Sequence, residues 1–361
     1  MFFNKNLLSI DIGSKYIKFL KFKGSKNFKI KEVGICEIPD GIIINGNIID
    51  KKKFLLLLKQ ELTSNNISKE NISITLDSAL TQINIIDITL DKDEILEEAI
   101  LYNAEQSLGK DLSDTIYDYK IIEKPTNSFS NNYKVVFAST TRETVDPLIE
   151  LFKSINLNIK IIDIDVFSLI NMIEFNYGKI PNLYVLINIG NSSTDVIICN
   201  NNNYLYSRKL SMGGRNLCSN LAEILKIEEK TSQKIFLSNK KLKSNIITSV
   251  DECYKLLIDE INNTLHYYLS QSKLEQKTKK HYPIFISGGC ATFYKLNEYI
   301  RKHLNNKVIT TNPFRKIKHS NLSFRRHRSD NLSKNHTTDD MKTHFSIASG
   351  LALRTYKQNF S

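Results

Sequence analysis

The stretch LLSIDIGSKYIKFLKF occupies residues 7–22, and a stretch of the same design, YVLINIGNSSTDVIIC, occupies residues 184–199. In each, an apolar run typical of a buried central strand ends in a short turn that contains Gly and Ser after a leading Asp or Asn. A second strand pattern follows each turn. This repetition of one α/β unit predicts two similar lobes with a cleft between them, where ligands collect.

Strand and helix patterns follow each copy in a similar order. After the first copy they predict strands at residues 7–12, 16–22 and 28–35, a helix at 52–62 and a strand at 72–76. After the second copy they predict strands at 184–189, 196–199 and 204–210, helices at 216–225 and 249–274, a strand at 284–286 and a helix at 292–304. The chain is therefore expected to be α/β.

A smaller unit lies between the two copies. Its patterns predict a helix at 91–108, strands at 116–122 and 135–138, a helix at 142–155 and a strand at 159–162. Acidic residues in the first turn of the first helix favour its dipole. This α-β-β-α-β block predicts an inserted subdomain.

The expected division of the chain has seven parts. They are residues 1–87, the first lobe core; 88–163, an inserted partner-binding subdomain; 164–183, a first lobe helix and crossover; 184–215, the second lobe core; 216–280, a helical nucleoside-side subdomain; 281–343, the second lobe core with a mobile basic loop; and 344–361, a terminal helix returning to the first lobe. Within the sixth part, residues 316–340 are rich in Ser, Asn, Arg and His and predict a surface loop.

Bulk composition narrows the class of protein. A chain of 361 residues can form more than one core. Its five scattered cysteines argue against disulfides or a zinc site and indicate a reducing cytoplasm. No apolar run reaches the length of a membrane span, and the N-terminus does not look like a secretory signal. The net charge of +12 includes clusters at 51–53 and 324–328, but no nucleic-acid motif accompanies it, so we expect a solvated surface and no nucleic-acid partner.

The first turn carries groups suited to phosphate. Gly13 permits a close backbone approach, and the Ser14 hydroxyl can face a phosphate oxygen. Asp11 could hold hydrated Mg²⁺, and Lys18, on the same strand face as Tyr16, could act as a phosphate countercharge. A sequence of this kind is also common in ordinary hairpins. The second turn, beginning at Asn188, is what favours a nucleotide clamp.

Two further glycine pairs precede helices. Gly213 and Gly214 come before the helix at 216–225, where a helix N-terminus favours an anionic group. Gly288 and Gly289 lie between a strand and a helix, where exposed backbone could pack on adenine or ribose. Either pair can also be a tight turn alone.

These stretches resemble the actin-like ATPase superfamily and, over the whole chain, the PilM family of type IV pilus assembly proteins. Further matching stretches are EIPDGIIINGNIID, DEILEEAILYNAEQSL, IFISGGCATFYKLNEYI and the terminal FSIASGLALR. The resemblance implies an actin-like (ribonuclease H-like) two-lobed fold with an inserted α/β subdomain. It also implies that the protein binds ATP with Mg²⁺. It places Gly190, Ser192 and Thr194 in the second phosphate loop and Asp165 where an acidic residue orients water. Without the resemblance, Asp165 reads as the N-cap of a helix at 166–177.

Two departures from the superfamily pattern matter. Asn188 stands where an Asp is usual, and an amide lacks the charge that helps to hold Mg²⁺, so hydrolysis is expected to be weak or absent. Lys15 and Tyr16 replace small residues of the first loop and either crowd the cleft or point outward.

The resemblance also implies a partner. Members of the family capture the N-terminal cytoplasmic segment of a membrane protein, PilN, between the first lobe and the inserted subdomain, which points here to the surfaces at 95–108 and 159–165. The chain would then be cytoplasmic and recruited to the inner membrane through PilN and other pilus platform proteins. Self-association stays open.

Three alternatives remain from the sequence. They are a cell-division protein of the FtsA kind, a sugar or acetate kinase, and a scaffold that binds no nucleotide. The FtsA reading lacks the membrane-binding helix expected after the last helix, where TYKQNFS stands instead.

Overall fold

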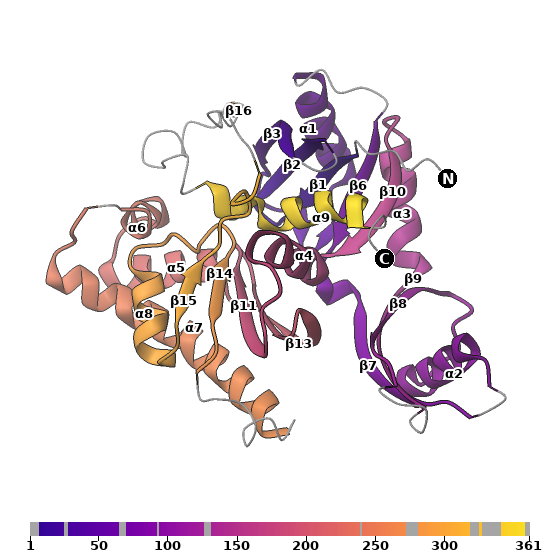
Figure 1. Ribbon diagram of the computed structural model, residues 1–361. Helices are drawn as coiled ribbons and strands as arrows, with labels where there is room; N and C mark the ends of the chain where they lie inside the picture. Colours follow the sequence, from indigo (N-terminus) through magenta and orange to yellow (C-terminus); the bar gives the residue numbers. More distant parts are fainter. Residues whose placement is uncertain are drawn as a thin grey trace.

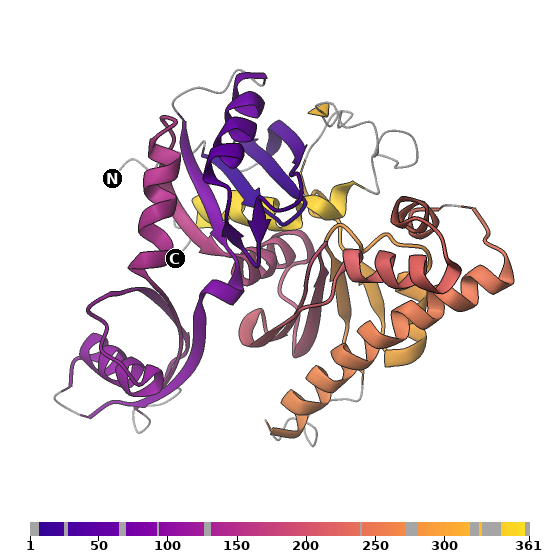
Figure 2. The same cartoon turned by 180° about the vertical axis from the view of Figure 1, so that it is seen from behind.

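The computed structural model describes residues 7–24, 28–64, 70–91, 94–125, 131–238, 240–271, 281–317, 325–326 and 341–357. Two sheets form the body of the molecule, one in the upper and one in the lower part of Figure 1, and a smaller three-stranded sheet projects to one side. The view from behind shows the same separation of the small sheet from the body (Figure 2).

The first sheet contains the first apolar strand and its hairpin partners. Its order is β10-β6-β1-β2-β3-β16. The strands are β1 (Leu8–Ile12), β2 (Tyr16–Lys23), β3 (Lys29–Glu37), β6 (Asn71–Leu76), β10 (Asn158–Ile164) and the two-residue β16 (Arg325–Arg326). Helices α1 (Lys51–Ser64) and α3 (Arg142–Lys153) pack on one face, where Phe54 and Phe152 are fully buried.

The second sheet repeats this arrangement. Its order is β13-β12-β11-β14-β15, and the directions of its pairs match those of β3-β2-β1-β6-β10 strand by strand. The strands are β11 (Leu183–Ile189), β12 (Thr194–Asn200), β13 (Asn203–Leu210), β14 (Ile284–Ser287) and β15 (Val308–Thr310). Helices α5 (Gly214–Leu225), α6 (Glu229–Phe236), α7 (Ser244–Gln271) and α8 (Leu296–Leu304) cover it. The predicted internal repeat is therefore present.

The inserted unit contains different strands and helices from those that the sequence predicts. Its sheet has the order β7-β9-β8, from β7 (Gln82–Thr89), β8 (Thr115–Glu123) and β9 (Asn132–Thr141), with α2 (Leu96–Leu108) on one face. Strand β7 was not predicted, because Asn84 and Asp87 interrupt its apolar alternation. Helix α3 and strand β10, expected in this block, belong instead to the first sheet.

Two helices lie between the main sheets. Helix α4 (Asp165–Tyr177), expected to belong to the first lobe, packs its apolar side chains on the second sheet. Helix α9 (Ser346–Lys357) packs on β1 and β2 of the first sheet. They touch where Gly350 meets Ser168, since a Cβ on Gly350 would collide with the Ser168 carbonyl. Helix α4, which follows the first lobe in the sequence, thus packs on the second sheet, and α9, which follows the second lobe, packs on the first (Figure 1).

Short elements complete the described fold. They are the hairpin β4 (Ile43–Ile44) and β5 (Asn47–Ile48), and the 3₁₀ turns η1 (Ser78–Leu80) and η3 (Lys342–Phe345). Helices α2 and α8 begin at Leu96 and Leu296, several residues later than predicted. Most of the expected surface loop at 316–340 lies outside the described residues; Arg325 and Arg326 within it pair with Gly34 and Ile35 of β3.

Candidate functional site

The two glycine turns have the same hydrogen bond. The Gly13 N–H donates to the Tyr16 carbonyl over 3.0 Å, and the Gly190 N–H donates to the Ser193 carbonyl over 2.9 Å. Each turn joins the first strand of its sheet to the second, so the repeat places them at equivalent positions. Both line one cleft of about 1190 Å³ between the lobes.

Most of the predicted site residues meet in this cleft. Its lining includes Asp11, Gly13, Ser14, Lys18, Asp165, Asn188, Gly190, Ser192, Gly214, Gly288 and Gly289. Two predicted residues do not line it. Thr194 is fully buried and its hydroxyl donates to the Met212 carbonyl over 2.7 Å, and Gly213 packs against the Asn191 backbone. These two residues shape the second turn from behind.

Asp11 and Lys18 form the charged centre of the first turn. They are directly opposite in the β1–β2 register, and the Lys18 ammonium group donates to the Asp11 carboxylate over 2.9 Å. Both side chains are largely buried. A Cβ on Gly13 would lie 2.9 Å from the Lys18 Nζ, so the missing side chain makes room for the ammonium group beside the turn. Lys18 therefore lies in the cleft beside the first turn, paired with Asp11.

The second turn has a different pair at the equivalent positions. Asn188 is opposite Asp195 in the β11–β12 register and donates its amide N–H to the carboxylate over 3.0 Å. The same carboxylate forms an ion pair of 2.9 Å with Lys209, its neighbour on β13. Asn188 is thus occupied by a protein carboxylate.

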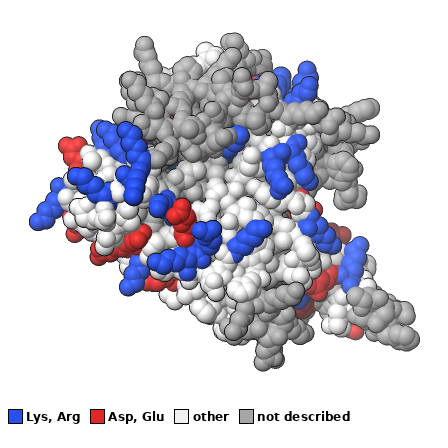
Figure 3. Space-filling view, turned by 60° about the vertical axis from the view of Figure 1, so that its left-hand side comes forward, with Lys and Arg blue, Asp and Glu red and all other residues white. Residues whose placement is uncertain are grey.

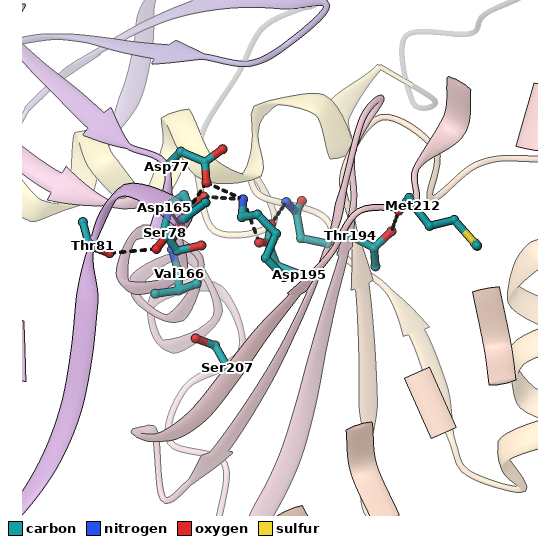
Figure 4. A network of polar contacts seen from close by, with 12 residues as sticks. Asp77, Ser78, Thr81, Asp165, Val166, Thr194, Asp195, Ser207 and Met212 are labelled. Carbon is teal, nitrogen blue, oxygen red and sulfur yellow. Dashed lines mark hydrogen bonds and ion pairs between the residues drawn. The ribbon is translucent and has the colours of Figure 1, made fainter. Parts of the chain in front are cut away.

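Lys209 also reaches across the cleft to the first lobe. Its ammonium group lies 2.9 Å from the Asp77 carboxylate, just after β6, and 3.2 Å from the Asp165 carboxylate at the start of α4. Figure 4 shows Asp77 and Asp165 on one side and Asp195 on the other, with the ion pairs as dashed lines between them. One ammonium group therefore joins three carboxylates from both lobes.

Burial gives these groups unusual proton affinities. Burial raises the pKa of Asp165 to about 7, an effect that the Lys209 charge opposes and the nearby Asp195 and Asp77 carboxylates reinforce. Burial alone would lower the pKa of Lys209, but the carboxylates of Asp165, Asp195 and Asp77 outweigh it and hold that pKa well above its ordinary value. Lys209 is therefore charged throughout the neutral range.

Asp165 differs from its predicted role as a helix cap. Helix α4 begins at Asp165 itself, and Ile164 occupies the N-cap position. The Asp165 carboxylate accepts the N–H of Val166 over 2.7 Å and that of Ser78 over 3.2 Å. The capping interpretation is therefore wrong by one residue, and Asp165 lines the cleft.

Glycines elsewhere in the lining permit close packing of the cleft wall. Gly288 has φ of +90°, and a Cβ there would collide with the Ile189 backbone. A Cβ on Gly289 would lie 2.7 Å from the His344 ring, which also contacts Tyr16 edge-on. Tyr16 is only 8% exposed, so it forms part of the wall and does not point outward.

Lys209 could not be recognised from the sequence. The β12–β13 hairpin turns at Asn201 and Asn202, and an unbroken ladder from that turn would pair Asp195 with Arg208. A bulge between Ile198 and Cys199 shifts the register by one residue, so Lys209 becomes the partner and faces the cleft. Nothing in the residue pattern indicates this bulge.

On the face shown in Figure 3, basic side chains form separate groups with acidic ones among them. Among the described helices, none has both the length and the apolar character needed to cross a bilayer.

Known proteins share this architecture. A solved PilM–PilN type IV pilus biogenesis complex contains a chain with 17% identity and a TM-score of 0.77, covering 97% of this chain and 98% of that one. The ethanolamine utilization protein EutJ of Carboxydothermus hydrogenoformans has 10% identity and a TM-score of 0.53, covering 96% and 89%. MreB5 of Spiroplasma citri, bound to ADP, has 12% identity and a TM-score of 0.53, covering 99% and 98%. These likenesses confirm the predicted actin-like fold.

The sequence comparison is more specific than the fold. The family model of the type IV pilus assembly protein PilM matches residues 9–356, which include both turns, the inserted sheet and all but the last residue of α9. The match therefore favours the predicted family over the cell-division and kinase alternatives. The chain belongs to the PilM family of type IV pilus assembly proteins.

Proposed function

We propose that this chain binds ATP in the interlobe cleft and acts as a cytoplasmic adaptor that captures the N-terminal segment of a PilN-like membrane protein. The partner would bring it to the inner membrane and to the other proteins of the pilus platform. Hydrolysis would be slow or absent. The observation that carries the proposal is that β10 leads directly into Asp165 of the cleft, while its residue Asp163 lies within reach of the charge of Asp118 on the inserted strand β8.

The cleft supports nucleotide binding by its paired turns. Gly13 and Gly190 hold equivalent hairpin turns on opposite lobes, so a polyphosphate between them would meet backbone from both sides. Lys18 lies beside the first turn, and the hydroxyls of Ser14 and Ser192 come from the two walls. The solved MreB5 of Spiroplasma citri, which shares the fold, binds ADP.

The expected Mg²⁺ at Asp11 fits less well. Mg²⁺ takes oxygen ligands in a near-octahedral set, usually with one or two carboxylates. The Asp11 carboxylate is already paired with Lys18, and Asn188 supplies an amide where a second carboxylate is usual. No cluster of three or more His, Cys, Asp or Glu suited to a metal ion occurs in the described part of the chain.

The junction between first lobe and insert supports partner binding. Strand β10 is one edge of the first sheet and β8 is one edge of the inserted sheet, so both have backbone groups available for a further strand. Arg354 of α9 bridges the two regions through an ion pair of 3.6 Å with Asp118 of β8. On the insert, Ile95 just before α2 and Tyr102 within it are exposed by 60% and 63%.

Asp163 of β10, at this junction, and Asp165, in the cleft, are only two positions apart in the sequence. Asp163 is buried, its carboxylate accepts the Ser168 hydroxyl over 3.2 Å, and the charges of Arg354 and Asp118 act on it. Asp165 is in the cleft and pairs with Lys209. A nucleotide that shifts Asp165 or Lys209 would therefore move the end of β10, which gives ATP a physical route to the partner site.

Two titrations test the proposal. Calorimetry with ATP is expected to show one saturable site, and Gly190→Val, which places a side chain against the Ser193 carbonyl, is expected to abolish it. Fluorescence anisotropy with the labelled N-terminal peptide of the PilN-like partner is expected to show binding, and a scrambled peptide is expected to show none. Absence of ATP binding by a folded chain would favour the nucleotide-free scaffold.

A further inference from the structure

Lys209 lies among three carboxylates of the cleft. Its ammonium group lies within 2.9–3.2 Å of carboxylate oxygens from Asp77, Asp165 and Asp195. The Lys209 side chain is 18% exposed, and the Asp165 and Asp195 side chains are 9% and 4% exposed. Buried charges of one sign are unfavourable without a partner, so this cluster depends on the lysine.

The geometry around Lys209 crosses from one lobe to the other. Asp195 and Lys209 are neighbours on β12 and β13 of the second sheet, whereas Asp77 and Asp165 come from the first lobe and the crossover helix. A bound metal ion stabilises charge on phosphoryl oxygens and orients the substrate. In this chain the cation that joins carboxylates of both lobes is the ammonium group of Lys209.

The other carboxylate of the cleft floor is paired as well. Lys18 holds Asp11 at 2.9 Å, and Asn188 donates to Asp195 and carries no charge of its own. A divalent ion would have to displace an ammonium group to reach either carboxylate. Displacement would leave that lysine buried without its partner, which is costly.

We propose that Lys209, with Lys18, is the resident cation of the cleft, so that this chain binds nucleoside triphosphate without a divalent metal ion. The inference rests on the proposed nucleotide site and concerns its countercharge. Both lysines line the cleft, Lys18 from the first lobe and Lys209 from the second. A triphosphate would therefore meet an ammonium group from each lobe with no metal ion between them.

Nucleotide binding with and without metal tests this directly. The full chain, freed of metal and nucleotide, is titrated with ATP in Mg²⁺ and again in EDTA. The expected dissociation constants agree within about threefold. Binding that weakens by about tenfold or more in EDTA overturns the inference and leaves the proposed ATP site standing. No binding in either buffer overturns the proposed function itself.

Variants locate the effect at Lys209. Lys209→Met leaves three carboxylates without their cation, and the expected result is Mn²⁺ binding detected by electron paramagnetic resonance, with ATP binding restored only by added metal. Lys209→Arg keeps the charge and should remain independent of metal. Lys230→Met removes an exposed lysine of the same cleft and is the matched control.

Each outcome decides the inference. Mn²⁺ binding by Lys209→Met but not by the wild type or Lys230→Met supports a resident cation. Equal Mn²⁺ binding by wild type and Lys209→Met overturns it, because the lysine would then not occupy the metal position. If Lys209→Met does not fold, the wild-type comparison in EDTA still decides.

Discussion

Asn188 lies directly across the β11–β12 hairpin from Asp195 and donates to its carboxylate over 3.0 Å, in the register position where Asp11 meets Lys18 in the other lobe. The two lobes therefore differ in where their charge lies. In the first, acid and base neutralise each other within the hairpin. In the second, the acid faces an amide and takes its countercharge from Lys209.

Asn188→Asp should make nucleotide binding depend on metal. The new carboxylate would face Asp195 at hydrogen-bonding distance, and directly opposed like charges in a hairpin are destabilising, here by roughly 1 kcal/mol. A divalent ion between the two carboxylates would relieve the repulsion. We expect ATP affinity in EDTA to fall by about tenfold relative to Mg²⁺, measured by calorimetry.

Asn191→Asp is the control for this change. It introduces the same charge in the same turn and the same cleft. We expect it to weaken ATP binding equally in Mg²⁺ and in EDTA. A metal requirement in Asn191→Asp as large as in Asn188→Asp would contradict the argument from the Asp195 contact.

The free energy of unfolding should depend on pH because of Asp165. Burial raises its pKa from 3.8 to about 7, so between these values the folded chain holds a proton that the unfolded chain has released. Stability contributed by this group therefore falls as pH rises, by at most about 1.4 kcal/mol for each pH unit. Lys209 stays charged over the range, and Asp77 and Asp195 are the other charged groups facing Asp165.

Asp165→Asn removes that dependence. The free energy of unfolding of the variant, minus that of the wild type, should increase as pH is raised from about 4 to about 7. Urea unfolding followed by circular dichroism at several pH values measures the difference. Parallel stability curves for the two proteins would show that the proton is not held at Asp165.

Gly350→Ala should destabilise the crossing of α4 and α9. The added Cβ would collide with the Ser168 carbonyl, which is backbone and has no rotamer to move away. Overpacking of this kind costs about 1–3 kcal/mol. Thermal unfolding measures the loss. Gly34→Ala is the control, because its Cβ would lie 3.6 Å from the Phe19 ring, an ordinary contact, and we expect a change within about 0.5 kcal/mol.

Asp118→Lys should weaken capture of the PilN-like peptide. Asp118 is 81% exposed at the junction of β8 and α9, where its ion pair with Arg354 adds little stability, so the variant should fold. Reversing the charge there repels Arg354 and changes the proposed partner surface. Anisotropy titration should show affinity reduced by about fivefold or more, within the usual range for an interface residue.

Glu260→Lys provides the comparison for Asp118→Lys. Glu260 lies on α7, away from the inserted sheet (Figure 1), and its exposed carboxylate forms an ion pair of 3.4 Å with Arg208 of β13. The substitution reverses its charge. Unchanged peptide affinity is expected. Equal losses in both variants would move the partner site away from the junction of β8 and β10.

The sequence was most informative where burial governs the pattern. The strands at 7–12 and 184–189 have almost every residue buried, so continuous apolar runs identified both central strands within one residue. Strand β7 has only two buried residues, Ile86 and Ile88, and its exposed positions hid it. The helix α4 was identified, but its sheet was not, because an apolar helix does not reveal which sheet it covers.

In the site, too, residues with a local role could be predicted from the sequence, whereas contacts between distant segments could not. Turn residues such as Gly13 and Gly190 are recognisable because their role is local. Asp77 and Lys209 meet in the cleft over a separation of 132 positions, as the register shift at Ile198 and Cys199 turns Lys209 inward. Thr194, which the family resemblance places in the second phosphate loop, faces the Met212 carbonyl because strand alternation points it away from the cleft.

The most direct test of the account is the affinity of the PilN-like peptide measured with and without saturating ATP. Strand β10 connects Asp165 in the cleft to Asp163 at the junction, so the account predicts tighter peptide binding with ATP, by about fivefold or more, the usual lower range of coupling between two sites. Equal peptide affinity in the two states would contradict it.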